Sequence, residues 1–208
     1  MPVTASATTL RREERREAIV RTAKEIFFAE GYAATSMATI AARVGGSKGT
    51  LYNYFTSKEE LFEAVVQDFL ERNSIVFSKL NVAEGDVDAA LASFGGQILR
   101  LMLSDDAIAM YRLIAGESGR FPEIGATYYE AVMRRGKQRL VERFAAAMDA
   151  GRIRRSDPAI AAQHFVDLCL SGLHRRRLWN IGPAPSEAEI DANIDQAVRA
   201  FLDGYRVK

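Results

Sequence analysis

The sequence predicts an all-α fold of about nine helices, with an N-terminal helix-turn-helix domain followed by a larger helical domain. Apolar residues recur at the i, i+3, i+4 and i+7 spacing of a buried helix face along most of the 208 residues. Alternating runs of Val, Ile and Thr, which would indicate strands, are nearly absent. Gly, Pro, Ser and Thr interrupt the apolar pattern at the points where helices would begin and end.

The first helix is expected over residues 10–30, where one apolar face is followed by Gly31, a natural helix end. Thr35 or Ser36 can cap a second, shorter helix over residues 37–44. The apolar residues of this second helix follow the spacing of a single buried face. The two segments therefore predict a long helix joined to a short one by a brief loop.

A glycine pair at residues 45–46 ends the second helix and supplies a turn. Ser47 can cap a third, very short helix that ends near Phe55. Thr56 or Ser57 can cap a fourth helix, and Ser57 can form a capping box with Glu60.

Five further helices are expected from the apolar periodicity of the remaining sequence. Pro122 and Pro158 lie where first-turn prolines belong, and Gly151 lies where a long helix would end. The expected helices span about residues 86–103, 105–118, 122–150, 158–179 and 187–205.

The composition argues against several classes of protein. The net charge of +1 is too small for a polycation that coats nucleic acid, so an anionic partner would have to bind a local patch. Cys169 is the single cysteine, which excludes an internal disulfide and is typical of a reducing cytoplasm. No apolar run reaches the ~20 residues of a membrane span, and the N-terminal residues lack the apolar segment of a secretory signal. We therefore expect a cytoplasmic protein with no membrane partner.

The segment SKGTLYNYFTSKEELF, residues 47–62, combines lysine, glycine and two tyrosines on one short helix and its flanks. A short helix, a glycine turn and a second short helix form a helix-turn-helix, whose second helix enters the major groove of DNA. Leu51 and Phe55 are expected to point inward. Lysine, threonine, asparagine and tyrosine can contact phosphates or base edges. The expected DNA-facing residues are Lys48, Gly49, Thr50, Tyr52, Asn53 and Tyr54, with Lys58 at the start of the next helix.

The first helix also carries the charged segment RREERRE, residues 11–17. Basic and acidic residues at this spacing predict a helix face of ion pairs. The alternative is that Arg11 and Arg12 reach a DNA phosphate or the minor groove.

Residues 31–62, GYAATSMATIAARVGGSKGTLYNYFTSKEELF, resemble the N-terminal DNA-binding domain of the tetracycline-repressor (TetR) family. The resemblance covers about residues 13–65, and its SKGTLYNYF core is highly specific. It implies a homodimer in which residues 1–57 bind DNA and residues 58–208 bind an effector and dimerise. Gly46 departs from the family, which usually has an apolar residue at this position. The DNA contacts implied by the resemblance are Thr35, Ser36, Lys48, Gly49, Thr50, Tyr52, Asn53, Tyr54 and Lys58.

The resemblance also implies that the last two helices of each subunit form a four-helix dimer interface. In this sequence those helices are expected over residues 158–179 and 187–205. The alternative is that their apolar faces are buried within a single subunit. The expected interface residues are Phe165, Leu168, Cys169, Gly172, Ile194, Val198, Phe201 and Leu202.

Methionine and aromatic side chains of the C-terminal half could line a cavity for a small, mostly apolar effector, because methionine is polarisable and pocket walls are rich in aromatic groups. For each of these residues the alternative is an ordinary core position. Arg112, His164 and His174 are candidate polar contacts of the effector. The expected effector-binding residues are Phe94, Leu101, Met102, Met110, Tyr111, Arg112, Phe121, Tyr128, Phe165 and Trp179.

The sequence therefore predicts a ligand-responsive repressor that binds a palindromic DNA operator as a homodimer and is released by its effector. The alternatives are a transcriptional activator and a helical DNA-binding protein without a small-molecule effector. No cofactor or metal is expected, because His164 and Cys169 do not share a helical face and a metal site needs more ligands. The sequence shows no nucleophilic or acid–base constellation, so we do not expect an enzyme.

Overall fold

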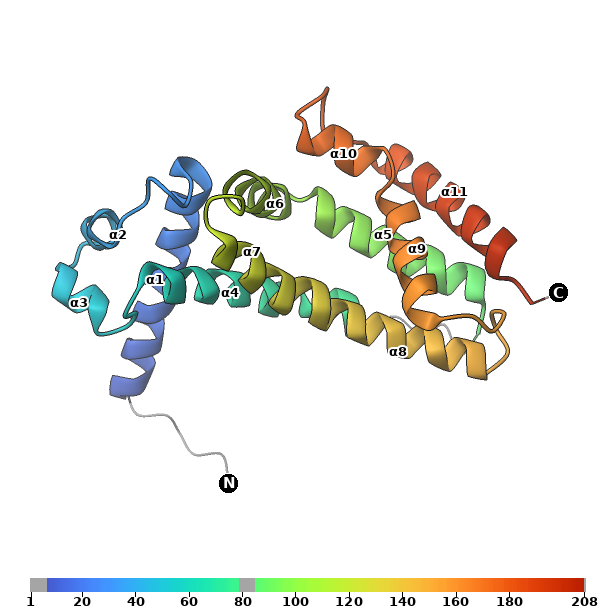
Figure 1. Ribbon diagram of the computed structural model, residues 1–208, viewed down its shortest axis with the longest axis horizontal. Helices are drawn as coiled ribbons and strands as arrows, with labels where there is room; N and C mark the ends of the chain where they lie inside the picture. Colours follow the sequence, from blue (N-terminus) through green and yellow to red (C-terminus); the bar gives the residue numbers. More distant parts are fainter. Residues whose placement is uncertain (1–6, 79–84, 208) are drawn as a thin grey trace. The chain divides into compact units, whose positions relative to one another are not determined.

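The computed structural model describes the chain over residues 7–78 and 85–207 (Figure 1). All regular structure in these two ranges is helical, which confirms the all-α prediction. No helix in the described ranges has both the length and the apolar character needed to cross a membrane. The elements are α1 Ala7–Glu30, α2 Met37–Val44, α3 Lys48–Tyr52, α4 Lys58–Ser78, α5 Val87–Leu103, α6 Asp105–Glu117, α7 Pro122–Tyr128, the π-helical segment η1 Tyr129–Arg134, α8 Arg135–Asp149, α9 Pro158–Leu170, α10 Leu173–Leu178 and α11 Glu187–Tyr205.

The chain folds into two compact units. Met1–Glu71 and Leu113–Tyr129 form the first unit, whereas Arg72–Arg112 and Glu130–Lys208 form the second. The first unit therefore combines α1, α2, α3 and the first part of α4 with a segment from the middle of the sequence. These units are defined by contacts within the chain and not by what each part binds. The expected division between a DNA-binding part and an effector-binding part after residue 57 therefore stays a prediction.

Four aromatic rings form the centre of the first unit. The rings of Phe27 and Tyr32 stack with their centroids 5.6 Å apart, and Phe62 meets both rings edge-on. Phe121, which directly precedes α7, lies edge-on against Tyr32 with the centroids 5.2 Å apart. Such pairs add to the free energy gained from burying the rings, so the cluster fixes the chain where α1 ends.

The internal segment Leu113–Tyr129 also holds the loop between α1 and α2 through a hydrogen bond. The backbone N–H of Ala33 donates to Oε1 of Glu117, the last residue of α6, at 3.1 Å. Gly31 lies beside this contact with a φ of 84°, in the left-handed region that favours glycine. A Cβ at residue 31 would lie 2.8 Å from the same Glu117 oxygen, so a side chain there would displace the carboxylate that accepts from Ala33.

The second unit is centred on Phe165 of α9. The centroid of its ring lies 6.2 Å from that of Phe94 on α5, 6.0 Å from that of Phe144 on α8, and 5.2 Å from that of Phe201 on α11. All four side chains are at most 2% exposed. The helices α5, α8, α9 and α11 therefore each contribute a ring to a single apolar core.

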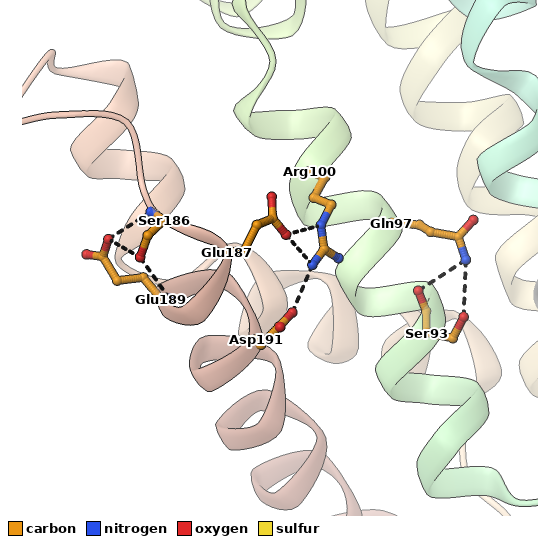
Figure 2. Close-up of polar contacts among 7 residues, drawn as sticks. All are labelled: Ser93, Gln97, Arg100, Ser186, Glu187, Glu189 and Asp191. Carbon is orange, nitrogen blue, oxygen red and sulfur yellow. Dashed lines mark hydrogen bonds and ion pairs between the residues drawn. The ribbon is translucent and has the colours of Figure 1, made fainter.

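The start of α11 is fixed by a cap and by ion pairs with α5, as Figure 2 shows. Ser186 and Glu189 form a capping box, in which each side chain bonds to the other residue's backbone N–H. Arg100 of α5 donates to Glu187 at 2.6 Å and to Asp191 at 2.8 Å. These charges are exposed, so they set the position of the helix end more than they stabilise the fold.

Two of the expected C-terminal helices differ from the structure. Residues 122–150 continue from α7 into α8, but Tyr129–Arg134 adopt π-helical geometry between them. Residues 158–179 are not one helix, because the chain breaks between α9 and α10 at Gly172, whose φ is 78°. A residue with this φ cannot continue an α-helix, so the prediction of one helix over residues 158–179 is wrong.

The side chains expected at a dimer interface lie mostly in the core of the second unit. A side chain that its own subunit covers has no surface left for a partner, so these assignments are wrong and the alternative of burial within one subunit holds. Leu168 is half-buried and Gly172 is exposed, and their assignment to an interface stays a prediction. The corrected residues, each at most 6% exposed in the single chain, are Phe165, Cys169, Ile194, Val198, Phe201 and Leu202.

Candidate nucleic-acid interface

Two serines begin the two short helices of the helix-turn-helix. Ser36 has an extended backbone, and its Oγ accepts a hydrogen bond from the backbone N–H of Thr39 at 3.1 Å. Ser47 caps α3 in the same way and accepts from the backbone N–H of Thr50 at 3.0 Å. Each cap satisfies a backbone donor that has no partner inside its helix. The starting points of α2 and α3 are therefore defined locally, as the sequence predicted.

Gly45 and Gly46 form the turn between α2 and α3. Gly45 is left-handed, with φ 71° and ψ 42°, a conformation that costs glycine little. The N–H of Gly45 donates to the carbonyl of Ala42 at 3.2 Å, and the N–H of Gly46 donates to the carbonyl of Ala41 at 3.0 Å. This pair of bonds is a Schellman motif, which ends many α-helices. The predicted glycine turn is confirmed.

The recognition helix α3 buries one side and exposes the other. Leu51 is 3% exposed and Phe55, just beyond the helix, is 0% exposed, so both point inward as expected. Tyr52 is 41% exposed, and Nζ of Lys48 lies 5.8 Å from the centroid of its ring. The exposed ammonium, hydroxyl and amide groups have the chemistry to contact phosphates and base edges, and their contact with DNA stays a prediction. The other expected residues are the exposed Gly49, Thr50 and Asn53 and the half-buried Tyr54.

Thr35 and Ser36 precede α2 in different environments. Thr35 is 2% exposed, and its Oγ1 donates a hydrogen bond to the carbonyl of Gly31 at 2.7 Å. This side chain is used inside the first unit, which contradicts the expectation that it contacts DNA. Ser36 is exposed at the start of α2, where a DNA contact remains an expectation.

Lys58, the first residue of α4, holds the loop between α1 and α2. Its Nζ donates to the carbonyl oxygens of Tyr32 at 2.8 Å and Thr35 at 3.2 Å, and it lies 4.1 Å from the centroid of the Tyr32 ring. The sequence did not show this role, because the two carbonyls lie 26 and 23 positions earlier in the chain. An ammonium group has three donors, so one is left for the predicted phosphate contact.

Tyr32 is also tied to α4 through its hydroxyl. The hydroxyl donates to Oε1 of Glu59 at 3.2 Å. Burial, and then the charge of the Glu59 carboxylate, raise the pKa of Tyr32 above its ordinary value. The pKa of Glu59 is lowered, because its carboxylate accepts hydrogen bonds from the backbone N–H of Glu59 itself and from the side chain of Ser57. The pair therefore stays a neutral donor and a charged acceptor at neutral pH.

Two arginines of α1 reach the end of the recognition helix. The guanidinium carbon of Arg12 lies 6.0 Å from the centroid of the Tyr54 ring, and that of Arg16 lies 5.0 Å from the centroid of the Phe55 ring. The signal in the sequence was the i, i+4 spacing within RREERRE, which places both side chains on one helix face. They add positive charge beside the expected DNA-binding face.

The residues expected to bind an effector are distributed over both units. Phe94 and Phe165 stack in the core of the second unit, whereas Trp179 is 66% exposed. Phe121 and Tyr128 belong to the first unit. An effector contact by any of them stays a prediction. In the second unit Leu101 and Met110 are buried, Met102 is half-buried, and Tyr111 and Arg112 are exposed.

Tyr111 and Arg112 contact α10. Arg112 donates from Nε to the carbonyl of Leu178 at 2.8 Å and from Nη2 to the carbonyl of Arg177 at 2.9 Å. The ring of Tyr111 lies edge-on to His174 with the centroids 5.6 Å apart, and burial lowers the pKa of His174. Of the polar groups expected to contact an effector, Arg112 thus holds α10 within the second unit, whereas Nδ1 of His164 lies 2.9 Å from the hydroxyl of Tyr205 on α11.

The second unit has a depression of about 480 Å³ that none of the expected effector residues lines. Its arginines are engaged, because Arg154 donates to the carbonyl of Gly204, Arg155 pairs with Asp149, and Arg206 pairs with Asp88. Its lining residues are Met148, Asp149, Gly151, Ile153, Arg154, Arg155, Arg206 and Val207.

Two family profiles match the chain. The profile described as bacterial regulatory proteins, tetR family, matches residues 19–65, which contain the helix-turn-helix. The profile described as AefR-like transcriptional repressor, C-terminal domain, matches residues 89–207, more than half of the chain.

Relatives of the chain are helix-turn-helix transcriptional regulators. The repressor ComR of Escherichia coli is 35% identical over 95 residues, 45% of each chain. The activator FasR of Mycolicibacterium smegmatis is 48% identical over 58 residues, 28% of this chain and 26% of FasR. The repressor Rv1474c of Mycobacterium tuberculosis is 26% identical over 187 residues, 89% of this chain and 93% of Rv1474c. The chain thus spans less than half the length of the first two relatives and nearly all of the third.

Solved structures of similar proteins cover almost the whole chain. A TetR-family regulator from Mesorhizobium loti superposes with a TM-score of 0.84 at 28% identity, over 95% of this chain and 99% of that one. The flavonoid-responsive regulator FrrA superposes with a TM-score of 0.82 at 30% identity, over 94% of this chain and 99% of FrrA. The helix-turn-helix geometry, the two profiles and these superpositions show that the chain belongs to the TetR family of transcriptional regulators.

Proposed function

We propose that the chain is a ligand-responsive repressor that binds a palindromic operator as a homodimer in the cytoplasm and leaves it when a small, mostly apolar effector binds. The observation that carries the proposal is the two-sided character of α3. Leu51 and Phe55 anchor the helix in the first unit, while Lys48 and Tyr52 stay exposed on a helix whose start is defined by the Ser47 cap. A surface of this kind supports insertion into the major groove.

The symmetry of the operator follows from the proposed dimer. Two copies of α3 would enter successive major grooves of one DNA face, about 34–36 Å apart. The net charge of +1 supports selective rather than general binding, because the affinity of non-specific binders comes mainly from positive charge.

The effector is proposed from chemistry and from a relative. The core of the second unit is rich in aromatic side chains, and FrrA is named as flavonoid-responsive, which supports an aromatic or otherwise apolar ligand. Release from DNA requires only that the effector bind the DNA-free arrangement more tightly than the DNA-bound one. Repression is supported by the names of ComR and Rv1474c.

A transcriptional activator is the second candidate function. FasR, which is 48% identical to this chain over the matched 58 residues, is named as an activator. A reporter gene placed behind the recovered operator separates the two functions. Expression that falls when the protein is supplied supports repression, and expression that rises supports activation.

The proposal is tested first by DNA binding. Genomic fragments that the protein retains at physiological salt are sequenced, and their affinities are measured by fluorescence anisotropy against scrambled fragments. Tyr52→Ala is expected to weaken operator binding by about 5- to 150-fold, as the loss of a specific contact would. Lys48→Ala is expected to weaken binding to all sequences and to reduce the salt slope by about one.

Matched controls separate binding from folding. Tyr129→Ala removes a tyrosine that is 61% exposed outside the helix-turn-helix, and it is expected to leave operator affinity unchanged. Circular dichroism should show the same thermal unfolding for wild type and for both α3 variants, because their side chains are exposed. The proposal fails if the wild-type protein selects no DNA sequence, or if the α3 variants lose as much stability as affinity.

A further inference from the structure

The junction between α2 and α3 lacks a side chain that such turns ordinarily use. Gly46 is the second residue after α2 in the Schellman motif, a position whose side chain commonly packs against the last turn of the preceding helix. An apolar residue there would tie the start of α3 to α2. The φ of Gly46 lies outside the left-handed region, so its backbone conformation does not itself require glycine.

Arg15 of α1 reaches this junction with its guanidinium group. A Cβ at residue 46 would lie 3.2 Å from Nη2 of Arg15 and 3.9 Å from Cβ of Thr50. The same Nη2 donates a hydrogen bond to the carbonyl of Val44, the last residue of α2, at 3.2 Å. This contact satisfies a carbonyl that has no partner within the helix and places positive charge at the negative end of the helix dipole.

The space left at the junction is small. A gap of about 10 Å³ remains between α1, α2 and α3, bounded among others by Arg15, Ile19 and Leu51. A water molecule needs roughly 10–15 Å³, so the gap holds at most one. The missing side chain at residue 46 therefore leaves little empty volume, because the half-buried Arg15 fills the junction from α1.

We infer that Arg15 is a positioning residue for the recognition helix. Its guanidinium group takes the place of the absent side chain at residue 46 and fixes the angle at which α3 leaves α2. The effect on DNA rests on the proposed function, because α3 must read DNA for its angle to matter. The docking of α3 is a property of the free protein. An apolar side chain at residue 46 should therefore make Arg15 dispensable.

Hydrogen exchange of the free, full-length protein tests the docking. The variants are Arg15→Ala, Gly46→Val and the double variant, with Arg21→Ala as a control that removes an exposed arginine from the same helix. Arg15→Ala is expected to speed the exchange of the hydrogen-bonded backbone amides of Gly46, Thr50 and Leu51 by about 5- to 30-fold. The double variant should return to within about 3-fold of wild type, and Arg21→Ala should match wild type.

Operator binding tests the consequence for DNA. Arg15→Ala is expected to lower operator affinity by about 10-fold with an unchanged salt slope, and Gly46→Val should restore the affinity in the double variant. Loss of affinity that persists in the double variant, with a salt slope reduced by about one, would make Arg15 a phosphate contact and overturn the inference.

The exchange data decide the inference even if the proposed function fails. A wild-type protein that selects no DNA would refute the function, while rescue of exchange by Gly46→Val would still support the role of Arg15. Two results would refute that role. One is backbone amide exchange in Arg15→Ala at the wild-type rate. The other is exchange in the double variant that is as fast as in Arg15→Ala.

Discussion

Lys58→Met tests how the first unit holds the loop that precedes the helix-turn-helix. The change keeps a long apolar stem and removes the ammonium group that donates to the carbonyls of Tyr32 and Thr35. A hydrogen bond from a charged group contributes about 1.5–3 kcal/mol when it is buried. Lys58 is half-buried and water can solvate the freed carbonyls, so we expect about 1 kcal/mol for each bond. Loss of the cation–π contact with Tyr32 adds about 0.5–1 kcal/mol.

The expected loss of about 2–3 kcal/mol can be measured by urea unfolding without DNA. With a slope of about 2–3 kcal/mol per molar urea, the midpoint should fall by about 1 M. Circular dichroism is the appropriate signal, because Trp179 is the single tryptophan and lies in the second unit. Lys48→Met is the matched control, since it removes the same charge from an exposed site and should cost less than about 0.5 kcal/mol.

One outcome would refute this account of Lys58. If Lys58→Met unfolds at the same urea concentration as wild type but loses operator affinity with a salt slope reduced by about one, the side chain acts only on phosphate. The hydrogen bonds to the loop would then contribute nothing measurable to stability.

Two further predictions concern the second unit. The side chain of Phe201 is 1% exposed, so Phe201→Ala is expected to lower the free energy of unfolding by about 3–5 kcal/mol. A variant that circular dichroism shows to be as stable as wild type, and that sedimentation shows to be a monomer, would contradict this. Burial raises the pKa of the Cys169 thiol to about 12, so at pH 8 far less thiolate is present than in the unfolded chain. Iodoacetamide should therefore label Cys169, by mass spectrometry, only after unfolding in urea, and rapid labelling of the native protein would show that the thiol is accessible.

The local features of the DNA-binding part could be predicted from the sequence, because each depends on a few neighbouring residues. Ser47 lies three residues before the N–H that it caps, and Gly45 supplies a conformation that few other residues adopt. Leu51 and Phe55 are one helical turn apart, so one buried face follows from their spacing alone. These signals are complete within a window of about ten residues.

Roles that depend on distant partners could not be predicted in this way. Lys58 carries an ammonium group that suits DNA, yet the carbonyls of Tyr32 and Thr35 that engage it lie 26 and 23 positions earlier, and their place is set by how the loop between α1 and α2 folds. The apolar faces of α9 and α11 posed a different difficulty. Apolar side chains are expected both in the core of a subunit and at an interface between subunits, so the sequence alone could not assign Ile194 and Phe201 to one of them. In the structure the single chain buries both side chains.

The return of Leu113–Tyr129 to the first unit limits how the DNA-binding part can be exchanged between proteins. A graft of residues 1–57 alone would leave the N–H of Ala33 without Glu117 and the ring of Tyr32 without Phe121. Such a chimaera would carry every expected DNA-contacting residue on the recognition helix but would lack two contacts that hold the loop before α2. The transferable module is discontinuous, and a regulator with a new operator would need both pieces from the same parent.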